Sequence, residues 1–254
     1  MKEAGICAGS KATIAQRENG LTSGQYAVVT GAGGGIGRAI ALALERQGLS
    51  LVLVGRDREK LDRVASEIGT RARIVTADLA TEEGISSVVD AVSDRLHVIV
   101  HCAGTYLRGP IASISADAWR SMEELNVRAP ILLAVGCLDR LRASQGQVVF
   151  INSTAGLSDG APGLAAYAAS KHALKAAVNV LRQEVNADGI RVLSLFPGRT
   201  DTPTQSAILA GEGRSAASDS LMRPDDVACM TIAALRLLWS AEVTDIVMRP
   251  MRPL

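Results

Sequence analysis

The sequence predicts an α/β fold with a doubly wound parallel sheet and helices on both of its faces. Short apolar runs alternate with amphipathic segments along the whole chain, which is the pattern of repeated βαβ units. No Pro-, Gly- or Ser-rich linker separates these segments, so the 254 residues are expected to form one domain with a core of good size. The first apolar run leads into a glycine-rich turn and a helix, which is a typical start of a nucleotide-binding unit.

The expected strands are apolar runs rich in Val, Ile and Leu, and seven of them follow one another along the chain. They span residues 27–30, 49–54, 72–77, 98–102, 147–152, 191–196 and 245–248. The segments between them have apolar residues at helical spacing, which predicts helices over residues 38–47, 59–68, 84–93, 117–135, 165–185 and 224–238. Residues 197–221, rich in Thr, Ser, Ala and Gly, are expected to be a long irregular loop that covers a bound ligand.

The composition argues against several classes of partner. With 27 basic and 26 acidic residues the net charge is +1, which gives no reason to expect nucleic acid or an anionic membrane surface. The apolar runs are far shorter than the roughly 20 residues needed to cross a bilayer. The four cysteines are scattered, so we expect neither a disulfide framework nor a metal site. His97 and His101 would lie about 13 Å apart on a strand, too far to share a metal ion.

The N-terminal segment differs in character from the rest of the chain. Residues 1–24 mix charged and small residues, without the apolar centre of a secretory signal or the Arg-rich, acid-poor bias of a transit peptide. We therefore expect a flexible extension over residues 1–24, a folded domain over residues 25–254 and a cytoplasmic location. Removal of the extension is expected to leave folding intact.

The glycine-rich turn is the first candidate site. The buried strand Gln25-Tyr26-Ala27-Val28-Val29-Thr30 runs into Gly31-Ala32-Gly33-Gly34-Gly35-Ile36-Gly37, and a helix follows. Glycines let the backbone approach a ligand closely, and a helix N-terminus offers unpaired N–H groups and the positive end of its dipole. An ordinary flexible loop is the alternative. So many glycines between two regular elements favour the phosphate cradle of a Rossmann fold.

A second candidate site is the pair Tyr167 and Lys171. Four residues apart on a helix, they share one face, with their Cβ atoms about 6 Å apart. An ammonium at that range favours the ionised phenol, so we expect it to lower the Tyr167 pKa and to make Tyr167 a general acid/base. The alternative is a Tyr on the apolar side of an Ala-rich helix with a solvated Lys nearby.

Together these motifs resemble the classical short-chain dehydrogenases/reductases, whose fingerprint is T-G-x-x-x-G-x-G followed, well over a hundred residues later, by Y-x-x-x-K. The resemblance covers residues 25–250 and extends to Asp78-Leu79, His101-Cys102-Ala103-Gly104, Asn126-Val127-Arg128-Ala129-Pro130, Asn152-Ser153-Thr154 and Phe196-Pro197-Gly198. Two features depart from it. The usual N-N-A-G is H-C-A-G here, and the segment after Pro197-Gly198 is shortened, reaching Thr200-Asp201-Thr202 at once.

The resemblance implies a role for each matching residue. Tyr167 would exchange a proton with the substrate oxygen, Lys171 would bond the nicotinamide ribose, and Ser153 would bond the substrate oxygen. Asn126 would hold a water that links Lys171 to solvent. Thr154 competes with Ser153 for its role, since the usual spacing to the tyrosine is thirteen residues, but Ser153 keeps the S-x-x-G relation with Gly156.

The implied dinucleotide contacts come from the ends of several strands. The residues concerned are Gly31, Gly33, Gly35, Ile36, Gly37, Arg56, Asp78, Leu79, Ala103, Gly104, Tyr167, Lys171, Pro197, Gly198 and Thr200. An enzyme that prefers NAD normally has an acid at the end of the second strand, where this chain has Gly55 followed by Arg56. Glycine leaves room for a 2′-phosphate and Arg56 can bond it, so NADP(H) is favoured. The alternative is that Arg56 is solvated and Asp57 holds the ribose of NAD(H).

The expected function is therefore an NADP(H)-dependent oxidoreductase that acts on a small or medium carbonyl or secondary alcohol. The resemblance also implies a homotetramer or homodimer. A non-catalytic dinucleotide-binding redox sensor or scaffold is one alternative, but such a protein is expected to have lost Tyr167 or Lys171. A nucleotide-sugar epimerase or dehydratase is another, but those proteins typically show T-G-x-x-G-x-x-G and a longer C-terminal domain, which this chain lacks.

Overall fold

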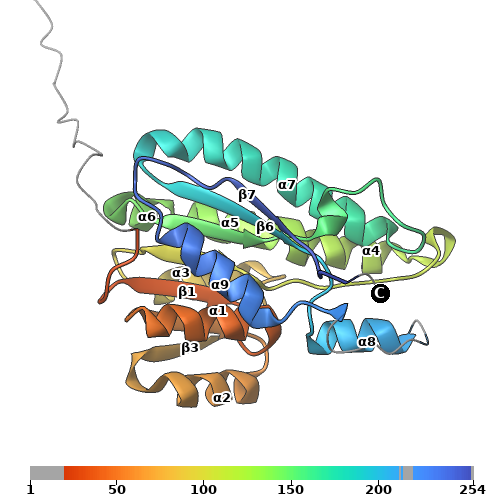
Figure 1. Ribbon diagram of the computed structural model, residues 1–254, viewed down its shortest axis with the longest axis horizontal. Coiled ribbons are helices and arrows are strands. Elements are labelled where there is room, and N and C mark those ends of the chain that lie inside the picture. The colour runs from red at the N-terminus through yellow and green to blue at the C-terminus, as the bar shows by residue number, and fades with distance from the viewer. Residues whose placement is uncertain (1–19, 212, 214–219, 253–254) are drawn as a thin grey trace, which may run out of the picture.

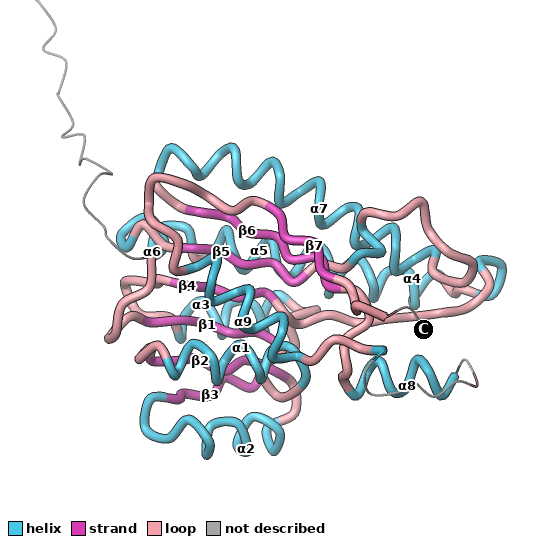
Figure 2. Tube along the Cα trace, viewed as in Figure 1, coloured by secondary structure: helices cyan, strands magenta, loops and turns pink. Residues whose placement is uncertain are grey.

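The computed structural model describes residues 20–211, 213 and 220–252. Its centre is a seven-stranded parallel sheet with the strand order β3-β2-β1-β4-β5-β6-β7, which confirms the predicted doubly wound Rossmann fold (Figures 1 and 2). The strands span Tyr26–Thr30 (β1), Ser50–Gly55 (β2), Ala72–Thr76 (β3), Val98–His101 (β4), Gln147–Ile151 (β5), Arg191–Pro197 (β6) and Asp245–Met248 (β7).

Helices cover both faces of this sheet. They span Gly35–Arg46 (α1), Arg58–Ile68 (α2), Glu82–Ala91 (α3), Ala116–Glu123 (α4), Ala129–Gly136 (α5), Leu138–Ser144 (α6), Ala165–Val185 (α7), Pro203–Gly211 (α8) and Pro224–Leu235 (α9). One core cluster packs α1, α2 and α9 on one face, and a second packs α3, α5 and α7 on the other. In Figure 1, α1 and α9 accordingly lie in front of the sheet while α3 and α5 lie behind it. None of the described helices is long and apolar enough to span a bilayer.

The helix predicted over residues 117–135 is interrupted. A π-helical turn, Glu124–Arg128, separates α4 from α5, and Pro130 occupies the start of α5. Proline has no N–H group, so it cannot donate the regular α-helical bond to the carbonyl of Asn126, four residues earlier. A wider turn accommodates this lost bond. The π-helical turn therefore contains Asn126, one of the predicted site residues.

Two further elements differ from the prediction. The stretch 197–221, expected to be irregular, contains α8, and a bridge from Thr200 to Met222 fixes its base. Helix α6 was not predicted at all, since its seven residues hold too few apolar positions to show a helical period. Residues 212 and 214–219 of the expected loop lie outside the described part of the chain.

The boundary between extension and domain also shifts. Leu21 is 4% exposed and belongs to the core, and the carbonyl of Gly20 accepts a 3.0 Å hydrogen bond from the side chain of Gln147. Residues 20–24 are therefore part of the folded domain, which corrects the boundary placed after residue 24. Residues 1–19 lie outside the described part, where the flexible extension stays a prediction.

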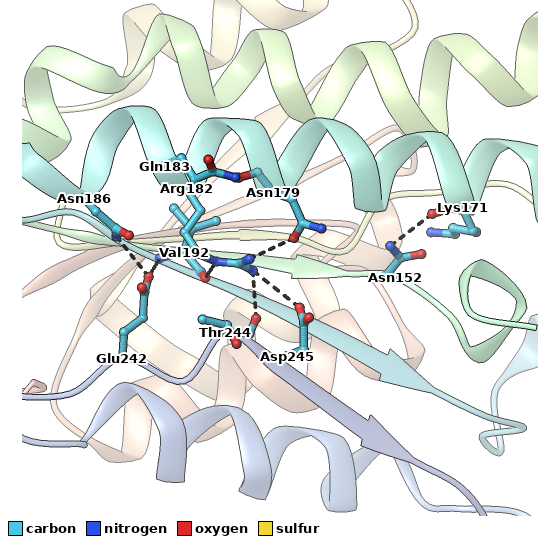
Figure 3. A network of polar contacts seen from close by, with 10 residues as sticks. All are labelled: Asn152, Lys171, Asn179, Arg182, Gln183, Asn186, Val192, Glu242, Thr244 and Asp245. Atoms are coloured by element: carbon cyan, nitrogen blue, oxygen red, sulfur yellow. Dashed lines mark hydrogen bonds and ion pairs between the residues drawn. The ribbon is translucent and has the colours of Figure 1, made fainter.

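A buried arginine fixes α7 to the sheet (Figure 3). Arg182 donates to the carbonyl of Val192 on β6 at 2.8 Å, to Asn179 at 2.8 Å and to the carbonyl of Thr244, just before β7, at 2.9 Å. Each bond from a charged donor stabilises by about 1.5–3 kcal/mol. Helix α7, whose first half carries Tyr167 and Lys171, is thus fixed to the sheet near its C-terminal end.

Candidate active site

A cavity of about 820 Å³ opens where the carboxyl ends of the strands meet. It brings together residues that are far apart in the chain, as expected for a doubly wound sheet. Every predicted site residue except Asn126 lines it: Gly31, Gly33, Gly35, Ile36, Gly37, Arg56, Asp78, Leu79, Ala103, Gly104, Ser153, Tyr167, Lys171, Pro197, Gly198 and Thr200.

The glycine-rich turn forms a close-fitting cradle. Gly31 has φ +66°, and a Cβ there would lie 2.9 Å from the backbone nitrogen of Ala103. A Cβ on Gly37 would collide with the carbonyl oxygen of Gly31. Helix α1 then begins with no side-chain cap and no acidic residue in its first turn. Its N–H groups and the positive end of its dipole therefore suit a phosphate, and the residues present fit a dinucleotide.

Thr30 ties the glycine turn to the end of β4. Its hydroxyl accepts hydrogen bonds from the backbone N–H groups of Cys102 at 3.0 Å and Ala103 at 3.1 Å. His101 is buried and stacks on Phe150 at 4.7 Å, and burial lowers its pKa to about 3, so it is neutral. The H-C-A-G departure therefore changes core packing behind the strand end but keeps the close backbone approach at Ala103.

Tyr167 and Lys171 lie together on the cavity side of α7. The Lys171 Nζ is 5.9 Å from the centroid of the Tyr167 ring and donates to the carbonyl of Ile151 at 3.2 Å. Burial raises the Tyr167 pKa, while a hydrogen bond with Ser153 lowers it. The expected lowering by Lys171 is therefore not what this structure shows. Loss of solvation is the largest effect on the Tyr167 pKa, and Lys171 is not among its causes.

Burial also acts on Lys171 itself. The side chain is 6% exposed, and its pKa is lowered from 10.5 to about 8. The folded chain thus binds fewer protons than the unfolded chain between about pH 8 and 10.5, and folding stability should rise with pH over that window.

We expect Lys171→Met to remove this pH dependence, because methionine does not titrate. The measurement is the free energy of unfolding in urea for both proteins from pH 8 to 10.5. The wild type should gain stability relative to the variant as the pH rises. If the free energy of unfolding changed with pH in the same way for both proteins, Lys171 would have the same pKa in the folded and the unfolded chain.

Ser153 stands two residues after the end of β5 and lines the same cavity as Tyr167 and Lys171. It begins the 3₁₀ turn Thr154–Gly156, and its hydroxyl accepts from the backbone N–H of Ala155 at 3.2 Å. A Cβ on Gly156 would lie 2.8 Å from the carbonyl oxygen of Lys171, so this turn is pressed against α7. The S-x-x-G relation thus corresponds to a physical contact. Thr154 also lines the cavity, but the hydrogen bond that affects Tyr167 comes from Ser153.

Asn126 is 1% exposed and lies behind the cavity wall. Its side-chain amide donates to the carbonyl of Thr105 at 2.9 Å and to Ser170 at 3.1 Å, and it accepts from the N–H of Thr105 at 2.8 Å. Ser170 in turn donates to the carbonyl of Tyr167 at 2.8 Å. The Asn126 side chain therefore joins the loop after β4 to the helix that carries Tyr167.

At the far end of the cavity, the end of β2 carries several charges. Arg56, Asp57, Lys60 and Arg63 all line the cavity there. Asp57 caps α2 by accepting from the N–H of Lys60 at 3.1 Å, and it forms an ion pair with Lys60 at 3.0 Å. These contacts hold the Asp57 carboxylate at the helix start and lower its pKa, first through the backbone bond.

Sequence reasoning missed several residues of the cavity wall. Among them are Lys60, Arg63, Tyr106, Arg108, Thr202, Gln205 and Ile208. Tyr106 packs its ring edge-on against that of Tyr167, with 4.9 Å between the centroids. Lys60 and Arg63 follow Arg56 at helical spacing, and this pattern could have predicted that they share one face with Arg56. The residues of α8 lie in the segment that was predicted to cover the ligand, but none of them was singled out, because the segment was expected to be irregular.

The comparisons with known proteins identify the family. The model of the short chain dehydrogenase family matches residues 25–213. An uncharacterized oxidoreductase of Staphylococcus epidermidis is 31% identical over 230 residues, which cover 89% of this chain and 97% of that protein. The chain belongs to the short-chain dehydrogenase family and is an NAD(P)-binding oxidoreductase of the Rossmann fold.

Solved structures give the same result. An alcohol dehydrogenase from the archaeon Thermococcus sibiricus, complexed with 5-hydroxy-NADP, superimposes with a TM-score of 0.81 at 26% identity, over 91% of this chain and 99% of that one. An NAD(P)-dependent gluconate 5-dehydrogenase from Beutenbergia cavernae, described as putative and with bound NADP, gives a TM-score of 0.80 at 31% identity, over 91% and 97% of the two chains.

Proposed function

We propose that this chain is an NADP(H)-dependent reductase or dehydrogenase of a small or medium carbonyl compound or secondary alcohol. One observation carries the proposal: Tyr167, Lys171 and Ser153 line the same cavity as the glycine-rich cradle. A proton donor, a hydroxyl donor and a dinucleotide cradle are what carbonyl reduction needs. A scaffold that only binds dinucleotide gives no reason for burying a lysine beside the tyrosine.

The bound nicotinamide supplies the hydride, and the chain supplies the proton and the orientation. In reduction the Tyr167 hydroxyl gives its proton to the carbonyl oxygen as negative charge develops there, and in oxidation it takes the proton back. Ser153 donates a hydrogen bond to that oxygen and so stabilises the developing charge. Because burial raises the Tyr167 pKa, the phenol is protonated at neutral pH and ready to act as the acid in reduction.

Lys171 and Asn126 complete the proposed proton route. Lys171, with a pKa of about 8, holds a proton that can return to Tyr167 and bonds the nicotinamide ribose. The Asn126 side chain is hydrogen-bonded to Thr105 and Ser170. A relay water would therefore bind the backbone carbonyl of Asn126, to which Pro130 has no N–H group to donate. The side chain itself acts as a positioning residue for the loop after β4.

The preference for NADP(H) is supported by the charges at the end of β2. A 2′-phosphate there would meet Arg56, Lys60 and Arg63, which line that end of the cavity. Asp57, the acid next to Arg56, caps α2 and forms an ion pair with Lys60. This contact opposes the alternative in which Asp57 turns to hold the ribose of NAD(H).

We expect at least about tenfold higher kcat/KM with NADPH than with NADH, equivalent to about 1.4 kcal/mol. Gly55→Asp combined with Arg56→Ile should invert the order, because an acid repels the 2′-phosphate and bonds a 2′-hydroxyl. A Cβ at residue 55 would lie 3.4 Å from the Leu61 side chain, so the substitution fits. Steady-state kinetics with both cofactors is the measurement. Equal kcat/KM with NADPH and NADH in the wild type would refute the proposed role of Arg56 in binding the 2′-phosphate.

The proposed partners follow from the same site. The cavity suits a small carbonyl or alcohol, and the proposed location is the cytoplasm. A homotetramer or homodimer is supported by exposed apolar side chains on α5 and α7, the helices next to Asn126 and Tyr167. Leu132, Val135 and Val180 are 38%, 49% and 55% exposed, and a second copy would cover them.

A further inference from the structure

A buried amide on α8 has no partner. Gln205 is 8% exposed, and its Nε2 makes no hydrogen bond within the residues that the structure describes. The same residue lines the cavity that holds the glycine cradle and Tyr167. Buried donors without a partner are rare and costly, so this one calls for an acceptor supplied by a ligand.

The place of Gln205 identifies which part of a ligand it would meet. Its backbone N–H donates to the Thr202 hydroxyl at 3.1 Å, which caps α8 and fixes its first turn. The Thr202 Cγ2 lies 3.0 Å from the point where a Cβ on Gly35 would be. Gly35 is the first residue of α1. The starts of α1 and α8 therefore meet at the same part of the cavity.

Both helix starts favour an anion. Neither α1 nor α8 has an acidic residue in its first turn, and each directs the positive end of its dipole to this place. Asp201, which precedes α8, is exposed and is not among the residues that line the cavity. A group that lies between the N-terminal ends of α1 and α8 and accepts a hydrogen bond from the Gln205 amide has the chemistry of a phosphate oxygen.

We propose that the start of α8 is a second phosphate-binding element, in which Gln205 Nε2 donates a hydrogen bond to the pyrophosphate of the dinucleotide. The pyrophosphate then lies between the glycine cradle and α8. The proposal rests on the proposed function only in requiring a dinucleotide in the cavity. It does not depend on hydride transfer, on the substrate or on the choice between NADP(H) and NAD(H).

The test is the affinity of Gln205→Met for ligands that contain or lack a pyrophosphate. Methionine keeps the length of the side chain and removes the donor. ADP-ribose and 2′-phospho-ADP-ribose contain the pyrophosphate without nicotinamide, whereas adenosine 2′-monophosphate lacks both. Each Kd is measured by displacement of fluorescent NADPH or NADH. The Kd of the first two should rise about tenfold, equivalent to about 1.4 kcal/mol, and that of the third should stay unchanged.

Matched controls separate this role from a structural one. Ser206→Ala, an exposed neighbour on α8, should leave all three affinities unchanged. The unliganded Gln205→Met protein should melt no lower than the wild type, because it no longer buries an unpaired donor. Gln205→Glu, which keeps the size and adds a negative charge, should weaken ADP-ribose binding further. It also serves as the test if the methionine variant fails to fold.

Three results would overturn the proposal: unchanged ADP-ribose affinity in both variants, an equal loss for adenosine 2′-monophosphate, or a loss seen only with ligands that contain nicotinamide. A wild-type protein that binds neither dinucleotide nor ADP-ribose would instead refute the proposed function.

Discussion

Replacing Tyr167 by Phe should lower turnover by about 10²–10⁴-fold or more, the usual contribution of a general acid/base. Phenylalanine keeps the ring that packs edge-on against Tyr106, so the cavity wall should persist. The change removes only the hydroxyl that exchanges a proton with the substrate oxygen. Neighbouring hydroxyls cannot replace it well, because Ser153 and Thr154 have no comparable tendency to ionise.

The control for this variant is its dinucleotide affinity. The phenol hydroxyl is not part of the glycine cradle, so the Kd for NADPH should stay close to that of the wild type. The measurement is kcat for carbonyl reduction at saturating cofactor, beside the fluorescence of bound NADPH. Near-normal turnover in Tyr167→Phe would refute the acid/base role.

Replacing Ser153 by Ala should have the second-largest effect, a loss of about 10²-fold or more in kcat, as expected when a donor to a developing oxyanion is removed. The Ser153 hydroxyl also lowers the Tyr167 pKa through its hydrogen bond, so its loss should raise that pKa further. The pH at which Tyr167 loses its proton in the rate profile should therefore move upward. This shift distinguishes a site contact from a general structural defect.

Thr154→Ala is the matched comparison, because Thr154 is adjacent and also lines the cavity. It should cost much less than Ser153→Ala in the same kinetic assay. If Thr154→Ala instead gave the larger loss, Thr154, which has the usual thirteen-residue spacing to Tyr167, would be the catalytic hydroxyl in place of Ser153.

The sequence predicted well whatever depends on local pattern. Parallel strands buried on both faces are continuous apolar runs, so all seven strands could be found. The glycine cradle could be predicted because positive φ at Gly31 and the close approach of Gly37 leave few other residue types. Ser153, Tyr167 and Lys171 were placed at one edge because the topology sends every strand end there.

Features that depend on tertiary packing could not be predicted. The direction of the Tyr167 pKa shift is set by burial, which the spacing to Lys171 does not reveal. Helix α8 is anchored by the bridge from Thr200 to Met222 and the contact of Thr202 with Gly35, both distant in sequence. Leu21 became part of the core because helices distant in the chain cover it, although no apolar periodicity surrounds it.

The central claim is that this chain transfers a hydride between nicotinamide and a carbonyl or alcohol with Tyr167 as the acid/base. The most direct measurement follows the absorbance of reduced nicotinamide during incubation with a panel of small and medium carbonyls and secondary alcohols. We expect the wild type to consume NADPH, with one alcohol formed per NADPH oxidised, and Tyr167→Phe to bind NADPH without consuming it. NADPH binding by the wild type without turnover of any compound in the panel would contradict the claim and favour a non-catalytic dinucleotide-binding sensor or scaffold.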